Sequence, residues 1–239
     1  MLKSSSLRFP LKFFIAQTGW ILFLVVSHLI TQLRNVFTGR SVEAVQGSMQ
    51  LLNLDNEANL PAWYSSCALF SCALLLAAIA ALPNSRRRDR TSWLGLSLMF
   101  MYLSLDEAIS IHERFLPGLL RQIDSLSFIS QSYDWTVLGG IAVVAVGIIF
   151  FRFWQRLPFA TRWLFAAAAA VFVGGAIGFE KISHFYEALY QTENSVAYVV
   201  TVAIEEGLEM MGVAIFIYAL LQYLYINTQR YVDFSKHPA

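Results

Sequence analysis

Long apolar runs, separated by short polar segments, dominate the pattern of the chain. Each run has about 20 residues or more, which is the length that an α-helix needs to cross a hydrocarbon core about 30 Å thick. No repeat of fixed period is evident. The pattern predicts an all-α fold, a polytopic membrane protein built as a bundle of six transmembrane helices. These helices are expected near residues 11–33, 61–82, 93–115, 135–157, 161–190 and 196–226.

Composition supports this class and excludes others. Hydrophobic residues make up 57% of the chain and charged residues only 14%, whereas a soluble domain carries roughly 25% charged residues. The net charge of +1 gives no basic field for nucleic acid, and two cysteines are too few for a disulfide scaffold. We therefore expect one membrane domain over residues 1–239, with membrane lipids and no nucleic acid as partners.

The distribution of Lys and Arg predicts the orientation, because cytoplasmic loops carry the excess of these residues. Twelve of them fall on one side of the predicted spans and three on the other. We therefore expect the protein in the plasma or inner membrane of the cell, with both termini on the cytoplasmic side. The first helix has a basic flank but no small-residue cleavage site, so we expect it to be retained. Residues 35–60 are expected as an outer-face loop with a short interfacial helix.

Ionisable residues within the predicted spans are the informative feature. Eight of the 16 acidic residues and three of the four histidines lie there, although a charge at mid-bilayer costs about 2.5–3.5 kcal/mol even on the lenient insertion scale. Combined with the predicted orientation, all of them fall in the outer half of the membrane. Residues three and four apart share a helix face, so they form stripes. The stripes comprise Glu180, His184 and Glu187 on the fifth helix, Glu205 and Glu209 on the sixth, Asp106 and Glu113 on the third, and His28 on the first.

Packed carboxylates in a low-dielectric site cannot all remain ionised, so protons or cations must neutralise them. Carboxylates and imidazoles on facing helices are the ligands of iron, manganese and zinc in bundle cores. The sequence thus predicts a site for one or more of these divalent metal ions, although the spacing differs from the Glu-x-x-His pattern of di-iron bundles. The predicted ligands are His28, Asp106, Glu180, His184, Glu187, Glu205 and Glu209. Glu113 and Glu206 are the predicted catalytic proton carriers, and participation of Glu107 and His112 is left open.

Three functions are compatible with this pattern, of which the first is the leading hypothesis and the other two are alternatives. The first is a metal-dependent membrane enzyme, either a di-iron-like oxidoreductase or a zinc hydrolase, acting on a lipid, a quinone or another apolar small molecule. The second is a proton- or cation-coupled transporter or channel, since chains of Asp, Glu and His also form such pathways. The third is a non-catalytic membrane subunit whose polar core only joins its helices.

Three motifs carry a resemblance to a group of proteins. The first is Asp55-x-Glu57-x-Asn59-x-Pro61-x-Trp63-Tyr-Ser-Ser66, the second is Leu105-Asp-Glu107 with His112-Glu113, and the third is Glu205-Glu-x-x-Glu209-Met. Together they resemble a group of uncharacterised multi-pass bacterial membrane proteins. The resemblance covers the loop and the second, third and sixth predicted helices. It implies a bacterial inner-membrane location and a shared role for these polar positions, and it attaches no activity to them.

Overall fold

The computed structural model describes residues 8–39, 48–83, 87–111 and 135–236, and in these residues every regular element is helical. The elements in chain order are α2 (Arg8–Thr38), α3 (Ser48–Leu51), α4 (Leu60–Ala81), α5 (Arg87–Ile109), α8 (Trp135–Arg156), α9 (Phe159–Val173), η4 (Gly174–Phe179), α10 (Glu180–Tyr190) and α11 (Val196–Lys236). The all-α fold class is therefore confirmed.

Among the described residues, five helices are long and apolar enough to cross a membrane: α2, α4, α8, α11 and the continuous segment from α9 to α10. The remaining predicted span, the third, corresponds to α5, which has 23 residues but is not among the five. Its arginine-rich first turn and the acidic pair near its end lower its hydropathy. The predicted continuation of this span to residue 115 lies outside the described residues.

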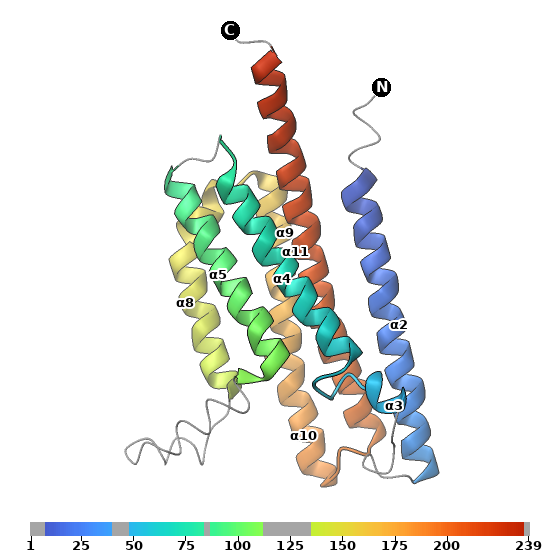
Figure 1. Cartoon of the computed structure of the whole chain (residues 1–239). Helices are drawn as coiled ribbons and strands as arrows, with labels where there is room; N and C mark the ends of the chain where they lie inside the picture. Colours follow the sequence, from blue (N-terminus) through green and yellow to red (C-terminus); the bar gives the residue numbers. More distant parts are fainter. Residues whose placement is uncertain (1–7, 40–47, 84–86, 112–134, 237–239) are drawn as a thin grey trace.

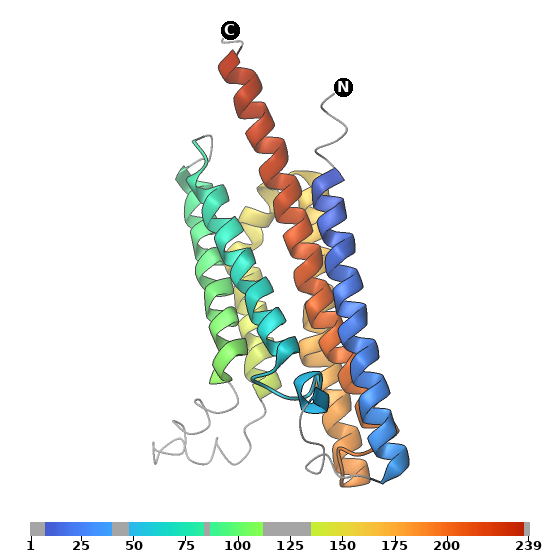
Figure 2. The ribbon, with the colours of Figure 1, turned by 45° about the vertical axis from the view of Figure 1, so that its right-hand side comes forward.

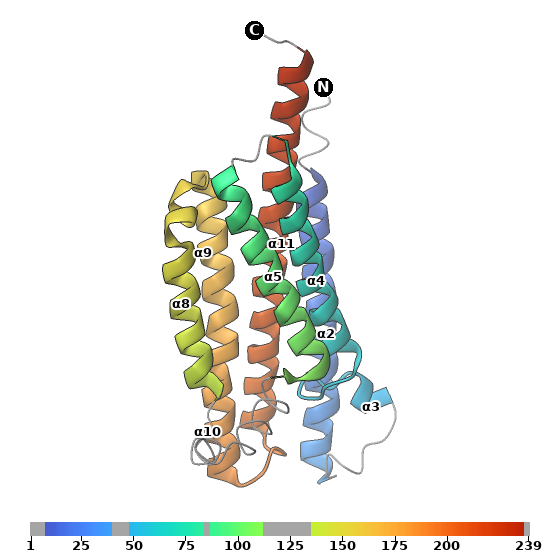
Figure 3. The ribbon, with the colours of Figure 1, turned by 60° about the vertical axis from the view of Figure 1, so that its left-hand side comes forward.

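Helix α11 is the central element of the bundle. It packs against α2, α4, α9, η4 and α10, and Figure 1 shows it running through the middle and extending past its neighbours. With 41 residues it is about 60 Å long at 1.5 Å per residue, about twice the thickness of a hydrocarbon core. Figure 2 shows α2 alongside α11, with α4 and α5 as a separate pair. Figure 3 shows α8 next to α9.

The two ends of the bundle differ. The start of α2 and the end of α11 lie at one end, whereas α3 and α10 lie at the other, called here the α10 end (Figure 1). Away from the α10 end, aromatic and aliphatic side chains fill the core. Trp93, which is 1% exposed, packs edge-on against Phe153, and Phe100 stacks on Phe216. This apolar packing joins α5, α8 and α11, and an ion pair of 2.8 Å between Asp89 and Arg156 also joins α5 to α8.

Short polar bonds align α4 with α5. The Ser66 hydroxyl donates to the Ser104 carbonyl oxygen at 2.8 Å, and the Ser104 hydroxyl donates to the Ser66 carbonyl oxygen at 2.9 Å. Such bonds are characteristic of helix pairs in membranes, where no water competes for the hydroxyls. Ser104 lies one turn before Glu107, so this contact fixes the position of Glu107 relative to α4.

A π-helical segment interrupts the predicted fifth span. The sequence predicts one continuous helix over 161–190, and the structure instead has η4 between α9 and α10. Gly175 allows η4 to pack closely against α11. A Cβ at this position would lie 2.7 Å from the carbonyl oxygen of Glu205 and 3.0 Å from Cγ of Glu209. A residue without a side chain lets the two helices approach this closely. π-Helical insertions of this kind are frequent at functional sites.

Replacement of Gly175 by Ala is expected to destabilise the bundle by about 1–3 kcal/mol, because the added methyl group overlaps the backbone of α11. The measurement is the unfolding of the purified protein in detergent micelles, by heat or by denaturant. Gly178→Ala is the matched control, since a Cβ at Gly178 meets nothing within 4 Å. Equal stability of the two variants would contradict the tight contact at Gly175.

Candidate functional site

Carboxyl groups from three helices converge on the half of α11 nearer the α10 end. Glu206 interacts electrostatically with Glu209, Glu107 and Glu205, and Glu209 interacts with Glu107, Glu205 and Glu180. We call these five residues the carboxylate cluster. All five side chains are half-buried. The structure thus brings together four residues of the predicted site, and it adds Glu107, whose participation the sequence left open.

Ser183 orients one member of the cluster and was missed by the sequence analysis. Its hydroxyl oxygen lies 2.9 Å from Oε2 of Glu205 and 2.9 Å from the backbone carbonyl oxygen of Glu180. The side chain is only 3% exposed, so it lies at the centre of the inward face of α10. Its position three residues after Glu180, on the same face, was the available signal.

The cluster has two sides because neighbouring residues of α11 point in different directions. Glu205 and Glu209 face η4, where Gly175 contacts them. Glu206 is offset by about 100° on the helix and interacts with Asp55 in the loop before α4. The predicted stripe of Glu205 and Glu209 leaves Glu206 on a neighbouring face of the helix, which agrees with these contacts.

Asp55 links the loop to α11. Its Oδ1 accepts a hydrogen bond of 2.9 Å from the hydroxyl of Tyr198. The Asp55 side chain keeps access to solvent, yet the surrounding protein removes enough water to raise the pKa of its carboxyl above the ordinary value of 3.8. The Tyr198 bond opposes this rise, the charge of Glu187 adds to it and His184 lowers it.

His28 holds the same loop from the other side. Its Nδ1 accepts the backbone N–H of Leu54 at 3.0 Å, and its Nε2 lies 3.4 Å from the carbonyl oxygen of Val199. The proton therefore belongs on Nε2, and both ring nitrogens are occupied by backbone groups. The side chain is 2% exposed. In this structure His28 joins α2, the loop and α11, and its assignment as a metal ligand remains a prediction.

The loop closes into the start of α4 through asparagine bonds. Oδ1 of Asn59 accepts from the backbone N–H of Ala62 and caps the helix, and Nδ2 of Asn59 donates to the carbonyl oxygen of Asn53. Pro61 occupies the first turn, where it loses no hydrogen bond. The motif around Asp55, Asn59 and Pro61 thus builds a rigid loop that presents Asp55 toward α11.

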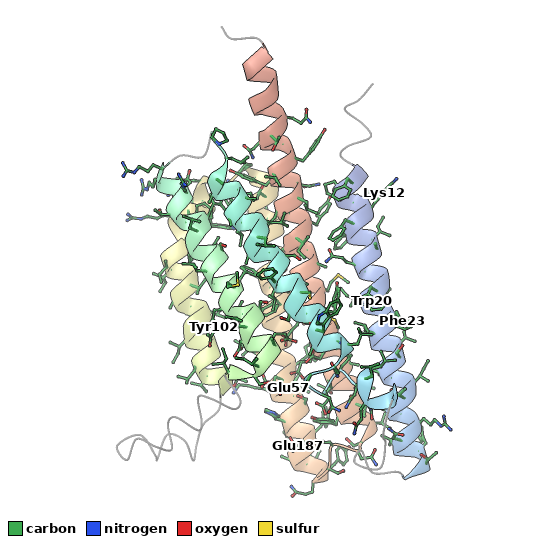
Figure 4. The ribbon with its side chains drawn as sticks, in the orientation of Figure 1. Lys12, Trp20, Phe23, Glu57, Tyr102 and Glu187 are labelled. Atoms are coloured by element: carbon green, nitrogen blue, oxygen red, sulfur yellow. The ribbon has the colours of Figure 1, made fainter. Side chains whose placement is uncertain are left out.

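The remaining predicted residues lie around the cluster. His184 is exposed and Glu187 half-buried, and both line a shallow depression at the α10 end with Ala188, Gln191, Thr192 and Glu193. Figure 4 shows Glu187 at that end of the bundle. Burial first, and then Asp55 and Glu187, raise the pKa of Glu193. Asp106 interacts with Tyr102 on its own helix, and the α5 acid that interacts with Glu206 and Glu209 is Glu107.

A compact metal centre is not preformed in the part of the chain that the structure describes. Among those residues, no three His, Cys, Asp or Glu side chains are grouped closely enough to hold a metal ion. Glu113, a predicted catalytic residue, and its neighbour His112 lie outside the described residues. The described residues form a set of carboxyl groups that influence one another electrostatically. Ser183 bonds Glu205 at one margin, and Tyr198 bonds Asp55 at the other.

Asp55 makes stability depend on pH with a defined sign. Because folding raises the pKa of Asp55, the free energy of unfolding falls as the pH rises from the ordinary value to the raised one. Asp55→Asn does not titrate but keeps an acceptor for Tyr198. We expect this variant to unfold at a higher temperature than the wild type at about pH 7.5 and to approach it at about pH 4.

Asp55→Ala is the control for this measurement, because it removes both the charge and the acceptor. It should follow the same pH trend at lower unfolding temperatures. If the unfolding temperatures of Asp55→Asn and the wild type differed by the same amount at both pH values, the raised pKa of Asp55 would be contradicted.

Comparisons with known proteins identify the family of the chain. No curated protein and no solved structure matches it. A family model described as a domain of unknown function, DUF8692, matches residues 18–224, which include the described carboxylate cluster and the loop around Asp55. The chain belongs to the DUF8692 family.

Proposed function

We propose that the chain is a proton- or cation-coupled integral membrane protein, and that the carboxylate cluster is its exchange site. The observation that carries this proposal is the mutual interaction of five glutamates from α5, α10 and α11. Carboxyl groups that interact in a low-dielectric region are costly to ionise together, and bound protons or cations lower this cost. Groups of this kind inside membranes usually mark ion and proton pathways.

Asp55 gives the cluster a connection to the α10 end. It interacts with Glu206 on one side and with Glu187 and Glu193 on the other. Glu193 is exposed, so titratable groups follow one another from the surface to the cluster. This order supports proton uptake from that end of the molecule.

The membrane arrangement is part of the proposal. We place six spans in the bilayer, with α5 as the third, and both termini in the cytoplasm. The α10 end then faces the extracytoplasmic side of the cell membrane. The distribution of Lys and Arg supports this orientation. Figure 4 is consistent with this orientation, because Lys12 lies toward one end of the bundle and Glu57 and Glu187 lie toward the other.

Variants of the cluster test the proposal directly. In vesicles that contain the full chain and a trapped pH-sensitive dye, Glu206→Gln and Glu209→Gln are expected to slow proton movement about tenfold or more, because each removes a group that binds and releases a proton. Asp89→Asn is the control and should lie within about twofold of the wild type, since Asp89 pairs with Arg156 in the first turn of α5, away from the cluster and from the uptake order.

Wild-type rates in both cluster variants, with the fold preserved, would contradict this function. That result would instead favour the structural role, in which the polar side chains only join the helices. Equal losses in all three variants would also contradict the proposal, because an acid away from the cluster would then matter as much as the cluster.

A metal-dependent enzyme is the second candidate. The contact of Glu205 and Glu209 with Gly175, together with the bond from Ser183 to Glu205, brings oxygen ligands from α10 and α11 to one place. Such ligands suit hard divalent ions, and iron or manganese more than zinc when few imidazoles take part. A bound ion would act as a Lewis acid or redox centre on a lipid, a quinone or another apolar molecule.

Metal analysis distinguishes the two candidates. Protein purified without chelators is expected to contain less than about 0.1 equivalent of iron, manganese or zinc if the cluster exchanges protons, and about one or two equivalents if it is a metal centre. Glu205→Gln and Glu209→Gln should abolish any stoichiometric metal. A stoichiometric metal lost in these variants but kept in Glu193→Gln would favour the enzyme.

A further inference from the structure

Arginines gather at the end of the bundle opposite the α10 end. The start of α5, the end of α8 and the start of α9 all lie there (Figure 3). These helix ends carry one acidic residue, Asp89, which pairs with Arg156 at 2.8 Å. The arginines, called here the arginine patch, are Arg87, Arg88, Arg90, Arg152, Arg156 and Arg162. Most of the positive charge of the patch is therefore not balanced by carboxylates on the same helix ends.

Arg162 is the least exposed member of the patch. It is half-buried, whereas the other five arginines are exposed. Its guanidinium lies over the ring of Trp154, with 5.6 Å from Cζ to the ring centroid. Its Nε atom is buried and has no hydrogen-bond partner among the described residues. A guanidinium keeps its charge in proteins, and an unbalanced charge is costly in apolar surroundings. The position therefore favours the binding of an anion.

Two features of the turn between α8 and α9 hold this positive group in place. The indole N–H of Trp154 donates to the backbone carbonyl oxygen of Arg162 at 2.9 Å, so the ring under the guanidinium is fixed by the same residue. No side-chain hydrogen bond caps the first turn of α9, and the partial positive charge of this helix start adds to that of Arg162. The turn thus presents a fixed cationic group rather than a freely moving side chain.

The surroundings of Arg162 indicate which kind of anion fits. The apolar spans Thr136–Arg156 and Phe159–Tyr190 end and begin at this turn, which places Arg162 near a membrane surface. Trp163 is 56% exposed and Phe159 is 72% exposed, and their rings pack edge to face at 6.1 Å. Exposed aromatic rings at this level are typical of contact with lipid headgroups and the adjoining acyl chains. A free phosphate would use only the charge, whereas a phospholipid would also cover the aromatic rings.

We propose that the turn between α8 and α9 binds an anionic phospholipid, with Arg162 contacting the phosphate and Phe159 and Trp163 lying along the acyl chains. The exposed arginines of the patch draw anionic lipid toward this end of the molecule. The guanidinium of Arg162 donates to the phosphate oxygens. This inference requires that α8 and α9 lie in a bilayer, and it does not depend on exchange at the carboxylate cluster.

Lipid selectivity tests the inference. The full chain, purified in a mild detergent, is mixed with equal amounts of phosphatidylglycerol and phosphatidylcholine, and the bound lipids are counted by native mass spectrometry. The wild type is expected to retain phosphatidylglycerol about fivefold more than phosphatidylcholine, and Arg162→Gln less than about twofold more. Arg88→Gln is the matched control, because it removes an exposed arginine of the same patch, and it should keep most of the preference.

The outcomes separate a lipid site from general attraction by positive charge. Equal retention of the two lipids by the wild type would overturn the inference, and this comparison needs no variant to fold. Equal losses of preference in Arg162→Gln and Arg88→Gln would overturn it as well, because the charge of the whole patch and not this turn would then select the lipid.

The unfolding temperature in detergent distinguishes the lipid from a free phosphate. Phosphatidylglycerol is expected to raise the unfolding temperature of the wild type by several degrees, because a lipid bound to the folded state stabilises it, and inorganic phosphate is expected to leave it unchanged. An equal rise with inorganic phosphate would overturn the lipid assignment and indicate a site for the free anion.

Discussion

The mutual repulsion of carboxyl groups around α11 is the constraint on which the rest of this structure depends. Three glutamates lie within five residues of one helix, and two more reach them from α5 and α10. A bundle that only needed to join its helices would use bonds like those between Ser66 and Ser104, which satisfy both partners without charge. The neighbouring elements instead bring like groups together, at an electrostatic cost that protons or cations must offset.

Local features of the chain serve that arrangement. Gly175 removes a side chain where η4 meets α11, so the backbone at Glu205 comes close enough for Ser183 to bond its carboxyl. On the other side, His28 and Asn59 fix the loop that carries Asp55. The cluster is therefore flanked by close contacts on two faces of α11.

The sequence predicted much of this because apolar length and helical phase are local properties. The helices α2, α4, α8 and α11, the beginning of α4 near Pro61 and the shared face of Glu205 and Glu209 all follow from them. The hydrogen bonds of His28 could not be predicted in this way, because its partners are backbone groups of Leu54 and Val199. The π-helical segment was also missed, since its cause is a contact between Gly175 and a helix distant in the sequence.

The difference between the two halves of α11 bears on mechanism. Toward the α10 end the titratable groups are close enough to influence one another, whereas the polar pair Tyr218 and Gln222 farther along the helix contains no carboxyl group and packs against Phe14. Neutral amides and hydroxyls bind water without holding a charge, so they do not store a proton. Carboxyl groups store it, because each exists in two protonation states. Under the proposed function, protons or cations bind at the carboxylate cluster near the α10 end, because only that half of α11 brings several carboxyl groups together.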